Sequence, residues 1–479
     1  MKIKDKTCIV FDIEVLKNIF TCTCKNTETG VIKVFEISSR KVDIQDLLDY
    51  FTQDCYFVGY NNHHYDNPVL NYIFSLYRKR YFEFFSTREI TESIFRMSQI
   101  VIDKNSNFEL WKEYKYTKNF LSIDLLTMLF SKALRVSLKE MQVTMQYKNV
   151  EEFVVDWKQD LPEKDMDRLI SYNINDVEST EELLYRCEKL LDIRVETERD
   201  FGLPCLSLDR VNLGDKLLQL KVMQKSGFTR DQLENMKSPM DRIDLEKVIF
   251  PFIKFNTPVL QKALQDMKNQ HNVSPGRKGY INTFIFGGME VTIGVGGIHG
   301  DNGCCSIKCN KDELLLDSDV NSLYPSLIAV YELYPPKLKS ILKEVYPEII
   351  QERLEFKNET YKYMLNGVTG KMQQEVSWLY APFSIMQVRI NGQLLLLMLA
   401  ERLLNLGCKL YQINTDGILY KIKKDKYDKL QQVLKEWEEL TKLTLETEQF
   451  TSFYQLAIND YFGVESDGNI KKKGFFLTD

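Results

Sequence analysis

Two aspartates end an apolar run near the middle of the chain. Leu314 to Leu316 lead directly into Asp317, and Asp319 follows two residues later. Alternate residues share one face of a strand, so both carboxylates should point the same way. Pro325 suits the first turn of a helix. The stretch predicts a strand, a tight turn and a helix, with acids that suit a hard divalent cation. The alternative is a loop with ordinary surface acids.

A second pair of acids lies near the N-terminus. Residues 7–15 form a β-rich run in which Asp12 and Glu14 are two apart. Two acids on one face of an apolar strand repel each other unless a cation lies between them. An edge strand with solvated acids is the alternative at this position.

Two later stretches add polar groups that could join this pair. After a strand that ends at Gly59 or Tyr60, a polar turn contains Asn62, Tyr65 and Asp66. Residues 168–184 predict a helix in which Tyr172 and Asp176 are four apart, hence on one face. A phenol and a carboxylate placed in this way can meet the same metal-bound water.

Length and composition set broad limits. A chain of 479 residues suggests about two to four domains. The net charge of −5 gives no global basic signature, although a local groove can still be basic. Ten cysteines are scattered along the chain, and the pairs Cys22/Cys24 and Cys304/Cys305 lack Cys-x-x-Cys zinc spacing, which indicates reduced thiols in a cytosol-like compartment. The apolar run 394–399 is too short to span a bilayer, so we expect no membrane partner.

The central stretch resembles a known motif. Residues 319–326 read Asp-Val-Asn-Ser-Leu-Tyr-Pro-Ser, which is similar to the first palm motif of the family B DNA polymerases. Residues 409–421 predict strand, Asp-Gly turn and strand, and resemble the third palm motif with Asn414 in place of its first Asp. The resemblance implies that Asp319 and Asp416 hold two Mg²⁺ ions, with Mn²⁺ as an alternative. It also implies that Tyr324 lies beneath the incoming deoxyribose.

A helix-like segment, residues 348–362, precedes a further match. Residues 362–370 are similar to the Lys-x-x-x-Asn-Ser-x-Tyr-Gly fingers motif, with Gly367 for Ser and Thr369 for Tyr. The resemblance implies a nucleotide site whose residues are Lys362 facing the triphosphate, Asn366 on the same helix face, Gly370 leaving room for the base pair, and Arg353 as a second phosphate contact. A solvated charged helix is the alternative for Arg353.

The acids of the N-terminal part resemble the three proofreading motifs of the 3′–5′ exonucleases. This resemblance implies a ribonuclease-H-like domain in which Asp12, Glu14 and Asp176 hold one metal ion, and Asp12 with Asp66 a second. The expected roles of the other residues are orientation of the attacking water by Tyr172, and contact with the single-stranded 3′ end by Asn62 and Tyr65.

Two other segments are predicted to contact DNA. Residues 293–300, with Gly296 and Gly297, resemble a segment that touches the template strand in phage family B enzymes; a plain hairpin turn is the alternative. Lys471 and Lys473 resemble a segment that holds primer phosphates, and a solvated basic tail is the alternative.

The predicted fold class is α/β and α+β multidomain, with a ribonuclease-H-like domain followed by an antiparallel palm and short helical fingers. The expected parts are an exonuclease domain over 1–195, a connecting region and start of the palm over 196–300, palm over 301–334, fingers over 335–372, and palm over 373–479. A thumb is expected to be absent or truncated, and a second polypeptide to supply it at an apolar patch formed by Phe475, Phe476 and Leu477.

The sequence therefore predicts a small phage-type family B DNA polymerase with proofreading, acting on primer-template DNA and dNTPs in the cytoplasm of a bacterial host. Two other functions stay open at this point. One is a 3′–5′ exonuclease with an inactive palm, and the other is a DNA-binding replication scaffold without enzymatic activity.

Overall fold

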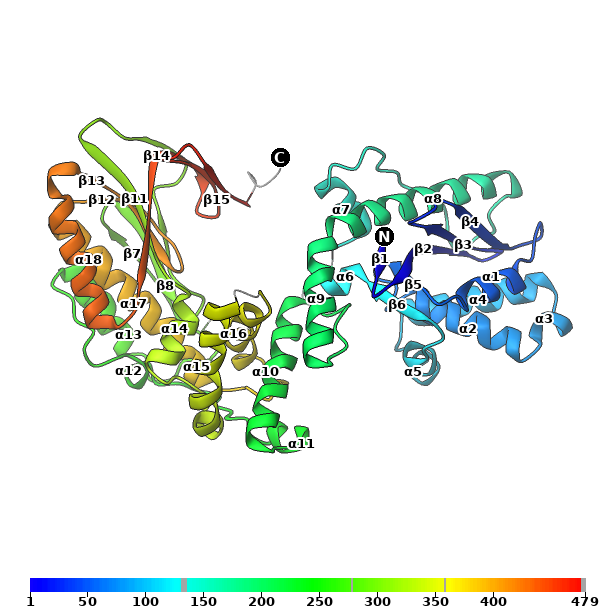
Figure 1. The fold of residues 1–479 in the computed structure, drawn as a ribbon, viewed down its shortest axis with the longest axis horizontal. Coiled ribbons are helices and arrows are strands. Elements are labelled where there is room, and N and C mark those ends of the chain that lie inside the picture. The colour runs from blue at the N-terminus through cyan, green and yellow to red at the C-terminus, as the bar shows by residue number, and fades with distance from the viewer. Residues whose placement is uncertain (131–135, 277–278, 357–358, 475–479) are drawn as a thin grey trace. The chain divides into compact units, whose positions relative to one another are not determined.

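The structure is a computed structural model that describes residues 1–130, 136–276, 279–356 and 359–474. The chain divides into two compact units, Met1–Leu213 and Gly214–Asp479. The five-part division predicted from the sequence is finer than this one and stays a prediction. The expected α/β and α+β character is confirmed, because each unit combines helices with one sheet (Figure 1).

The first unit contains a mixed sheet and the helices around it. Its strands are β1 (Lys2–Ile3), β2 (Lys6–Leu16), β3 (Ile19–Asn26), β4 (Ile32–Ile37), β5 (Tyr56–Gly59) and β6 (Leu121–Asp124). Its helices are α1 (Ile44–Phe51), α2 (Asp66–Arg78), α3 (Tyr81–Phe84), α4 (Thr87–Ile102), α5 (Phe108–Tyr116), α6 (Leu125–Leu129), α7 (Leu138–Thr144), α8 (Glu163–Arg186) and α9 (Glu188–Phe201). Helix α10 (Arg210–Ser226) crosses the boundary between the units.

Strand β2 is central in this sheet, and its two faces pack against different helices. The order is β4-β3-β2-β5-β6, with antiparallel pairing from β2 to β4 and parallel pairing from β2 to β6. Phe11 and Ile13 point into a core shared with α1, α2 and α4, whereas Cys8 and Val10 point into a core shared with α7 and α8. Figure 1 shows α8 on one side of the strands and α2 and α4 on the other. Even-numbered residues of β2 therefore face α8.

Several contacts far apart in sequence fix α8 on this face. Leu16 and Ile19 pack against Leu161, Met166 and Leu169 at the start of the helix. The Asn18 amide donates to the Leu161 carbonyl at 2.9 Å and accepts from the Leu161 N–H at 2.8 Å.

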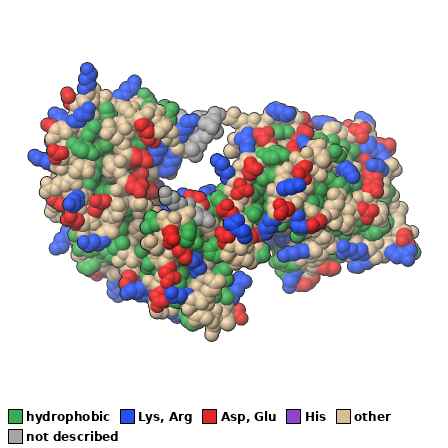
Figure 2. Space-filling view, viewed as in Figure 1, with side chains coloured by type: hydrophobic (Ala, Val, Ile, Leu, Met, Phe, Trp, Pro, Cys, Tyr) green, Lys and Arg blue, Asp and Glu red, His purple; other side chains and the backbone are tan. Residues whose placement is uncertain are grey.

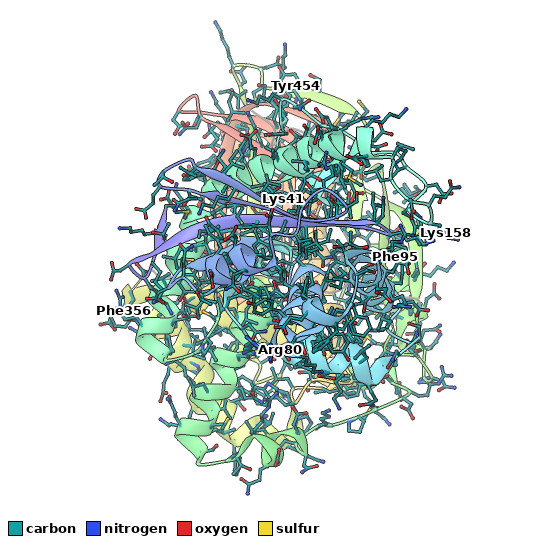
Figure 3. All side chains as sticks on the ribbon, turned by 90° about the vertical axis from the view of Figure 1, so that its right-hand side faces the viewer. Lys41, Arg80, Phe95, Lys158, Phe356 and Tyr454 are labelled. Atoms are coloured by element: carbon teal, nitrogen blue, oxygen red, sulfur yellow. The ribbon has the colours of Figure 1, made fainter. Side chains whose placement is uncertain are left out.

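The segment that leads into α8 is also held against a helix of the opposite face. The rings of Phe95 in α4 and Trp157 have centroids 6.3 Å apart. In Figure 3, Phe95 and the neighbouring Lys158 are labelled side by side. The segment before α8, the helix that contains Tyr172 and Asp176, is thus anchored at Trp157.

The second unit is built on an antiparallel sheet. Its strands are β7 (Ile281–Phe286), β8 (Met289–Gly294), β9 (His299–Asp301), β10 (Cys305–Lys308), β11 (Glu313–Val320), β12 (Lys409–Ile413), β13 (Gly417–Lys423), β14 (Leu445–Ala457), β15 (Asp460–Glu465) and β16 (Ile470–Lys473). The order is β16-β15-β14-β11-β13-β12-β9-β8-β7, with β10 beside β14, and all pairings among the described residues are antiparallel. Beside α10, its helices are α11 (Arg230–Glu234), α12 (Leu245–Val248), α13 (Pro258–Lys268), α14 (Leu323–Val330), α15 (Lys339–Phe356), α16 (Glu359–Met372), α17 (Pro382–Leu406) and α18 (Tyr427–Thr441).

Helix α17 is the core helix of the second unit. Among the described residues it is the one helix long and apolar enough to cross a membrane, but 83% of its apolar window is buried inside the protein. Its buried polar side chains bind the backbone of neighbouring segments. Gln393 accepts from the Gly294 N–H at 2.9 Å and donates to the Gly294 carbonyl at 2.8 Å. The Glu401 carboxylate accepts from the N–H groups of Asn256 and Thr257.

Helices α15 and α16 form a pair that α10 supports. Lys221 and Lys225 of α10 make ion pairs with Glu352 at 2.6 Å and Glu348 at 2.7 Å. Gly214 lies so close to α16 that a Cβ there would overlap the Tyr363 carbonyl. The helix predicted over 348–362 is confirmed for its described residues, since 348–356 belong to α15 and 359–362 to α16. Residues 357 and 358 lie outside the described part of the chain.

Two candidate active sites

The first acid cluster (Asp12, Glu14, Asp66 and Asp176) forms where β2, α2 and α8 meet. Asp12 and Glu14 lie on the face of β2 that is turned toward α8, as the alternation of the strand predicts. Oxygen atoms of Asp12, Glu14 and Asp176 all lie within 4.8 Å of one another. Residues separated by most of the first unit's sequence are thus brought to one point.

Asp66 completes the cluster from the N-terminus of α2. Its side chain is 3% exposed, and it accepts a hydrogen bond of 3.2 Å from the Ile13 N–H of β2. A carboxylate in the first turn of a helix is favoured by the helix dipole. This position places Asp66 near Asp12 and Glu14, whose charges influence each other.

Burial raises the pKa values of Asp12, Glu14 and Asp66, and so favours the protonated forms of these three acids. Burial first, and then the neighbouring carboxylates, raise the pKa of Glu14 to about 8 and that of Asp12 well above its usual range. Burial also raises the pKa of Asp66 to about 7, although hydrogen bonds from backbone N–H groups oppose this shift. A cation among the acids would reverse these shifts, because opposite charge favours the ionised form.

Three residues without a predicted role lie among the acids. Lys139 of α7 pairs with Asp176 at 2.5 Å and lies 4.4 Å from the centre of the Tyr172 ring. Gln142 of α7 donates to Asp176 at 2.9 Å, and Asn173 of α8 donates to Asp12 at 2.6 Å. Only the packing of α7 against α8 brings Lys139 and Gln142 here, so local sequence patterns gave no signal for them. Asn173 follows Tyr172 directly, and the helical spacing could have indicated it.

The donor chemistry of this cluster fits a hard divalent cation. Its carboxylate groups offer only oxygen atoms, which Mg²⁺ and Mn²⁺ prefer. Two further buried oxygen atoms, Asn173 Oδ1 and Gln142 Oε1, have no hydrogen-bond partner among the described residues. Burying a polar oxygen without a partner costs free energy, so the cluster is better satisfied with a bound cation or its water.

Tyr172 and Tyr65 both lie beside the cluster. Burial and the nearby carboxylates, Asp176 first, raise the pKa of the Tyr172 phenol. Burial, and then Glu14 and Asp66, also raise the pKa of Tyr65. Both phenols therefore stay protonated and can donate hydrogen bonds near the acids at neutral pH. Their predicted roles, orienting water and contacting the DNA end, stay predictions.

Asn62 is less accessible than its predicted role requires. Its side chain is fully buried, and its amide lies 2.7 Å from Ser122 Oγ and 3.3 Å from Asn67 Oδ1. The turn that contains it is held by Asp124, which accepts from the N–H groups of Asn61 and His63 at 3.0 and 3.1 Å. These contacts indicate that Asn62 shapes the turn, and direct contact with a DNA end stays a prediction.

The second acid cluster (Asp317, Asp319, Asp416 and Glu448) forms on the antiparallel sheet. On β11, Asp319 lies opposite Gly417 of β13, and Asp317 lies opposite Glu448 of β14. A Cβ on Gly417 would overlap the Asp319 carboxylate, so only glycine leaves room for this side chain. The predicted strand, turn and helix are confirmed as β11, the Asn321–Ser322 turn and α14.

Lys471 reaches this cluster from the edge strand β16. Its ammonium lies 2.7 Å from Glu448 and 3.6 Å from both Asp317 and Asp319. Lys471 pairs with Gly463 of β15, which has no side chain to block the path across the sheet. The predicted contact of Lys471 with primer phosphate stays a prediction, since in this structure its charge lies among acids.

The charges of the second cluster depend on one another. Burial, and then the Asp319 charge, raise the pKa of Asp317 to about 7. Burial also raises the pKa of Asp319, and Asp416 and Glu448 add to the shift while Lys471 opposes it. Like charges opposite one another on paired strands destabilise a sheet, so a positive charge among them, such as the Lys471 ammonium, is favourable. All-oxygen donors again fit a hard divalent cation.

The turn between β12 and β13 contains Asn414 and Asp416. The predicted Asp-Gly hairpin is confirmed, since the two strands pair on either side of it. Asn414 Oδ1 accepts a hydrogen bond of 2.8 Å from the Thr415 N–H, so the amide oxygen is used within its own turn. Asp416 is exposed, and its charge acts on Asp319 and Tyr324.

The predicted nucleotide-binding residues come from α14, α15 and α16. Tyr324 is the second residue of α14, and Gly392 of α17 lies against its ring edge, where a Cβ would be 3.7 Å from Tyr324 Cε1. Arg353 of α15 donates to Ser322 Oγ at 3.1 Å, which places its guanidinium at the N-terminus of α14. Lys362 is 45% exposed and lies 3.4 Å from Glu359. Tyr324 and Arg353 are thus brought together at α14.

The remaining predicted residues lie elsewhere in the second unit. Asn366 is exposed on α16 and Gly370 lies near its end, without a described contact to the acids. Gly296 and Gly297 lie in the turn that joins β8 and β9, and their contact with the template strand stays a prediction. Lys473 lies 5.6 Å from the centre of the Tyr461 ring. The predicted apolar patch at 475–477 lies outside the described residues.

Surface charge adds no strong indication of a partner. Figure 2 shows acidic and basic side chains interspersed on the visible face, without a continuous basic stripe. This agrees with the net charge of −5.

Comparison with known proteins gives one line of support at the level of the fold. No family model and no curated protein matches the chain. Among solved structures, the chain is similar to the family B DNA polymerase from the hyperthermophilic archaeon Pyrobaculum calidifontis, with a TM-score of 0.50 and 17% sequence identity. The match covers 98% of this chain and 60% of that one, so the chain spans less than two thirds of the other protein's length. At this identity the similarity concerns the fold alone.

Proposed function

We propose that the chain is a DNA polymerase of the family B type with 3′–5′ exonuclease activity, acting on primer-template DNA and dNTPs. The observation that carries the proposal is the pair of separate acid clusters, one in each compact unit: the first brings three acids within 4.8 Å of one another, and the second lies on paired strands around Lys471. The motifs indicate all four acids of the first cluster, and Asp319 and Asp416 of the second. The fold shared with a family B DNA polymerase supports the same function.

In the second unit, Asp319 and Asp416 would hold Mg²⁺ ions. When bound, such ions supply activation of the primer 3′-OH and stabilisation of the leaving pyrophosphate. The chain's own residues position the nucleotide. The N-terminus of α14 is suited to a phosphate group, and Arg353 lies beside it. Lys362 adds positive charge from α16, and the Tyr324 ring forms the surface beneath the sugar.

In the first unit, Asp12, Glu14, Asp66 and Asp176 would hold the metal ions of phosphodiester hydrolysis. When bound, such ions supply an activated water and stabilisation of the leaving oxygen. The Tyr172 phenol, which stays protonated, can donate to the attacking water. Lys139 holds Asp176 in place through their ion pair and limits the repulsion among the acids.

The proposal is tested with one labelled hairpin primer. The purified chain is incubated with Mg²⁺, with and without dNTPs, and the products are resolved by length. We expect extension with dNTPs and shortening without them. Shortening alone would support the exonuclease with an inactive palm, which the neutral Asn414 favours. Binding of the hairpin without either reaction would support the replication scaffold.

A further inference from the structure

The first palm motif begins at Asp319 and gives no role to Asp317, yet Asp317 lies inside the second acid cluster. Its side chain is 8% exposed. Its carboxylate and that of Asp319 are both 3.6 Å from the Lys471 ammonium, so the two acids point at one position. A buried carboxylate is costly unless it is paired. The sheet could have accommodated an apolar residue, because Leu315 and Leu419 are buried on the same face.

The ion pair with Lys471 does not fully account for Asp317. The ammonium is closer to Glu448, at 2.7 Å, than to Asp317. A carboxylate offers about four lone-pair positions, so Asp317 retains acceptor capacity toward a second cation. Asp317 and Asp319 are alternate residues of one strand, and the backbone pairing of β11 with β13 and β14 fixes their separation.

The turn between β12 and β13 has an uncharged residue, Asn414, where the family motif has an aspartate. Asn414 stands before Thr415 and Asp416, and it contributes no negative charge. Its amide oxygen is bonded to the Thr415 N–H at 2.8 Å. A site that holds divalent cations needs negative charge to offset the loss of their water. The charge that Asn414 does not supply is present on the neighbouring strand, at Asp317.

We propose that Asp317 is a metal-site acid of the second unit, which supplies the negative charge that Asn414 lacks. The inference rests on the proposed function of this site. Lys471 neutralises Asp317, Asp319 and Glu448 while no divalent cation is bound, and a bound cation takes over that role. Asp317 lies on β11 and Asn414 in the turn between β12 and β13, and in this proposal a carboxylate at either position serves the same site.

The test measures Mn²⁺ binding to the full-length chain by electron paramagnetic resonance, without DNA or nucleotide. The substitutions Asp12→Asn and Glu14→Gln form the background and weaken the first-unit site. Asp317→Asn is compared with Asp317→Asn/Asn414→Asp, in which the carboxylate is moved across the cluster. The matched control is Glu313→Gln, since Glu313 also lies on β11 and pairs with a lysine, Lys421, at 2.9 Å.

We expect Asp317→Asn to weaken Mn²⁺ binding by at least about tenfold. The double variant should recover most of this loss, and Glu313→Gln should stay within about twofold of the background. Thermal unfolding confirms that each variant is folded. Unchanged binding by folded Asp317→Asn would overturn the proposal, and so would a loss that Asn414→Asp does not restore.

The readout separates this proposal from the proposed function. A chain that binds Mn²⁺ through Asp317 but extends no primer would refute the polymerase and leave the metal-site acid in place. A chain that extends primers while Asp317→Asn binds Mn²⁺ normally would refute the metal-site acid alone.

Discussion

The first acid cluster draws its carboxylates from a strand and two helices, whereas the second draws them from neighbouring strands and a hairpin turn. Asp12 and Asp176 meet only because α8 is held against β2 by contacts such as those of Asn18 with Leu161. Asp319 and Glu448 are placed by the backbone hydrogen bonds of one sheet. The first cluster thus depends on helix packing, and the second on strand register.

Their counter-ions differ in the same way. Lys139 comes from α7, which packs on the helix that contains Asp176. Lys471 crosses the sheet from its edge strand, and glycines at 417 and 463 provide the space that this face needs. Similar groups of acids are therefore positioned by helix packing in the first unit, and by glycines that leave space for side chains in the second.

The largest expected effect separates the two clusters. Asp12→Ala or Asp66→Ala should reduce primer degradation by about 10²- to 10³-fold and leave extension largely intact, because fixed electrostatic stabilisation is lost at one site only. Asp319→Ala or Asp416→Ala should do the reverse. Both rates are measured on the labelled hairpin. Loss of nucleotide incorporation in folded Asp12→Ala protein would contradict the assignment of the clusters.

A smaller but more specific effect tests the space at the second cluster. Gly417→Ala places a Cβ where the Asp319 carboxylate lies, so we expect extension to fall by about 10- to 100-fold while degradation persists. The control is Gly468→Ala, at a turn glycine whose Cβ would meet no atom within 4 Å. Gly468 has a φ of +93°, so an alanine there strains the backbone but causes no steric clash. Equal extension by the two variants would argue against the crowding of Asp319.

Sugar discrimination should depend on the ring of Tyr324. If the ring lies beneath the incoming sugar, Tyr324→Ala should raise ribonucleotide incorporation relative to deoxyribonucleotide by roughly tenfold, because a steric penalty is removed. Tyr324→Phe keeps the ring and should leave the ratio unchanged. Competition between the two nucleotides in single-turnover incorporation gives this ratio. An unchanged ratio in Tyr324→Ala would mean that the ring packs against Gly392 and does not select the sugar.

The pH dependence of stability should reveal the protonated acids of the metal-free protein. The pKa of Glu14 is about 8 and that of Asp66 about 7, both above the values of unfolded chains. A group with a raised folded pKa stabilises the fold at low pH and loses this contribution as pH rises through the folded pKa. We therefore expect metal-free stability to fall between pH 6.5 and 8.5, by on the order of 1 kcal/mol.

Thermal unfolding with EDTA and with Mg²⁺ checks this expectation. The window begins at pH 6.5 because burial lowers the pKa of His63 to about 4, so His63 contributes mainly at lower pH. Mg²⁺ should raise the unfolding temperature more at pH 8.5 than at pH 6.5. Glu14→Gln should reduce the slope of the metal-free profile, and the remainder comes from groups such as Asp66 and Asp317, whose pKa values are about 7. A profile that rises with pH in both proteins would exclude protonated acids as the cause.

The smallest expected effect concerns Asn414. Asn414→Ala removes the hydrogen bond to the Thr415 N–H, so we expect about 0.5–1.5 kcal/mol of lost stability and a weaker affinity for Mg²⁺, seen as a higher Mg²⁺ concentration at half-maximal incorporation. Activity at saturating Mg²⁺ should persist, since Asp319 and Asp416 keep their charges. A titration of single-nucleotide incorporation against Mg²⁺ checks this result. Complete loss at saturating Mg²⁺ would mean that Asn414 is itself an essential ligand.

The sequence by itself determined the local elements and the faces that contain the acids. The apolar run before Asp317, the Asp-Gly turn and the pairs two or four residues apart are short-range patterns, and strand and helix periods translate them directly into geometry. For this reason β11, the β12–β13 hairpin and the common face of Asp12 and Glu14 could be predicted.

Only the tertiary structure decided which other groups complete each cluster. Lys139, Gln142 and Lys471 reach the acids across long sequence separations, and their positions depend on how α7 packs and on where β16 joins the sheet. The burial of Asn62 and the steric need for Gly417 likewise follow from neighbours that no local pattern contains. Charge pairing and close packing act between segments distant in the chain, so they become visible only once the chain is folded.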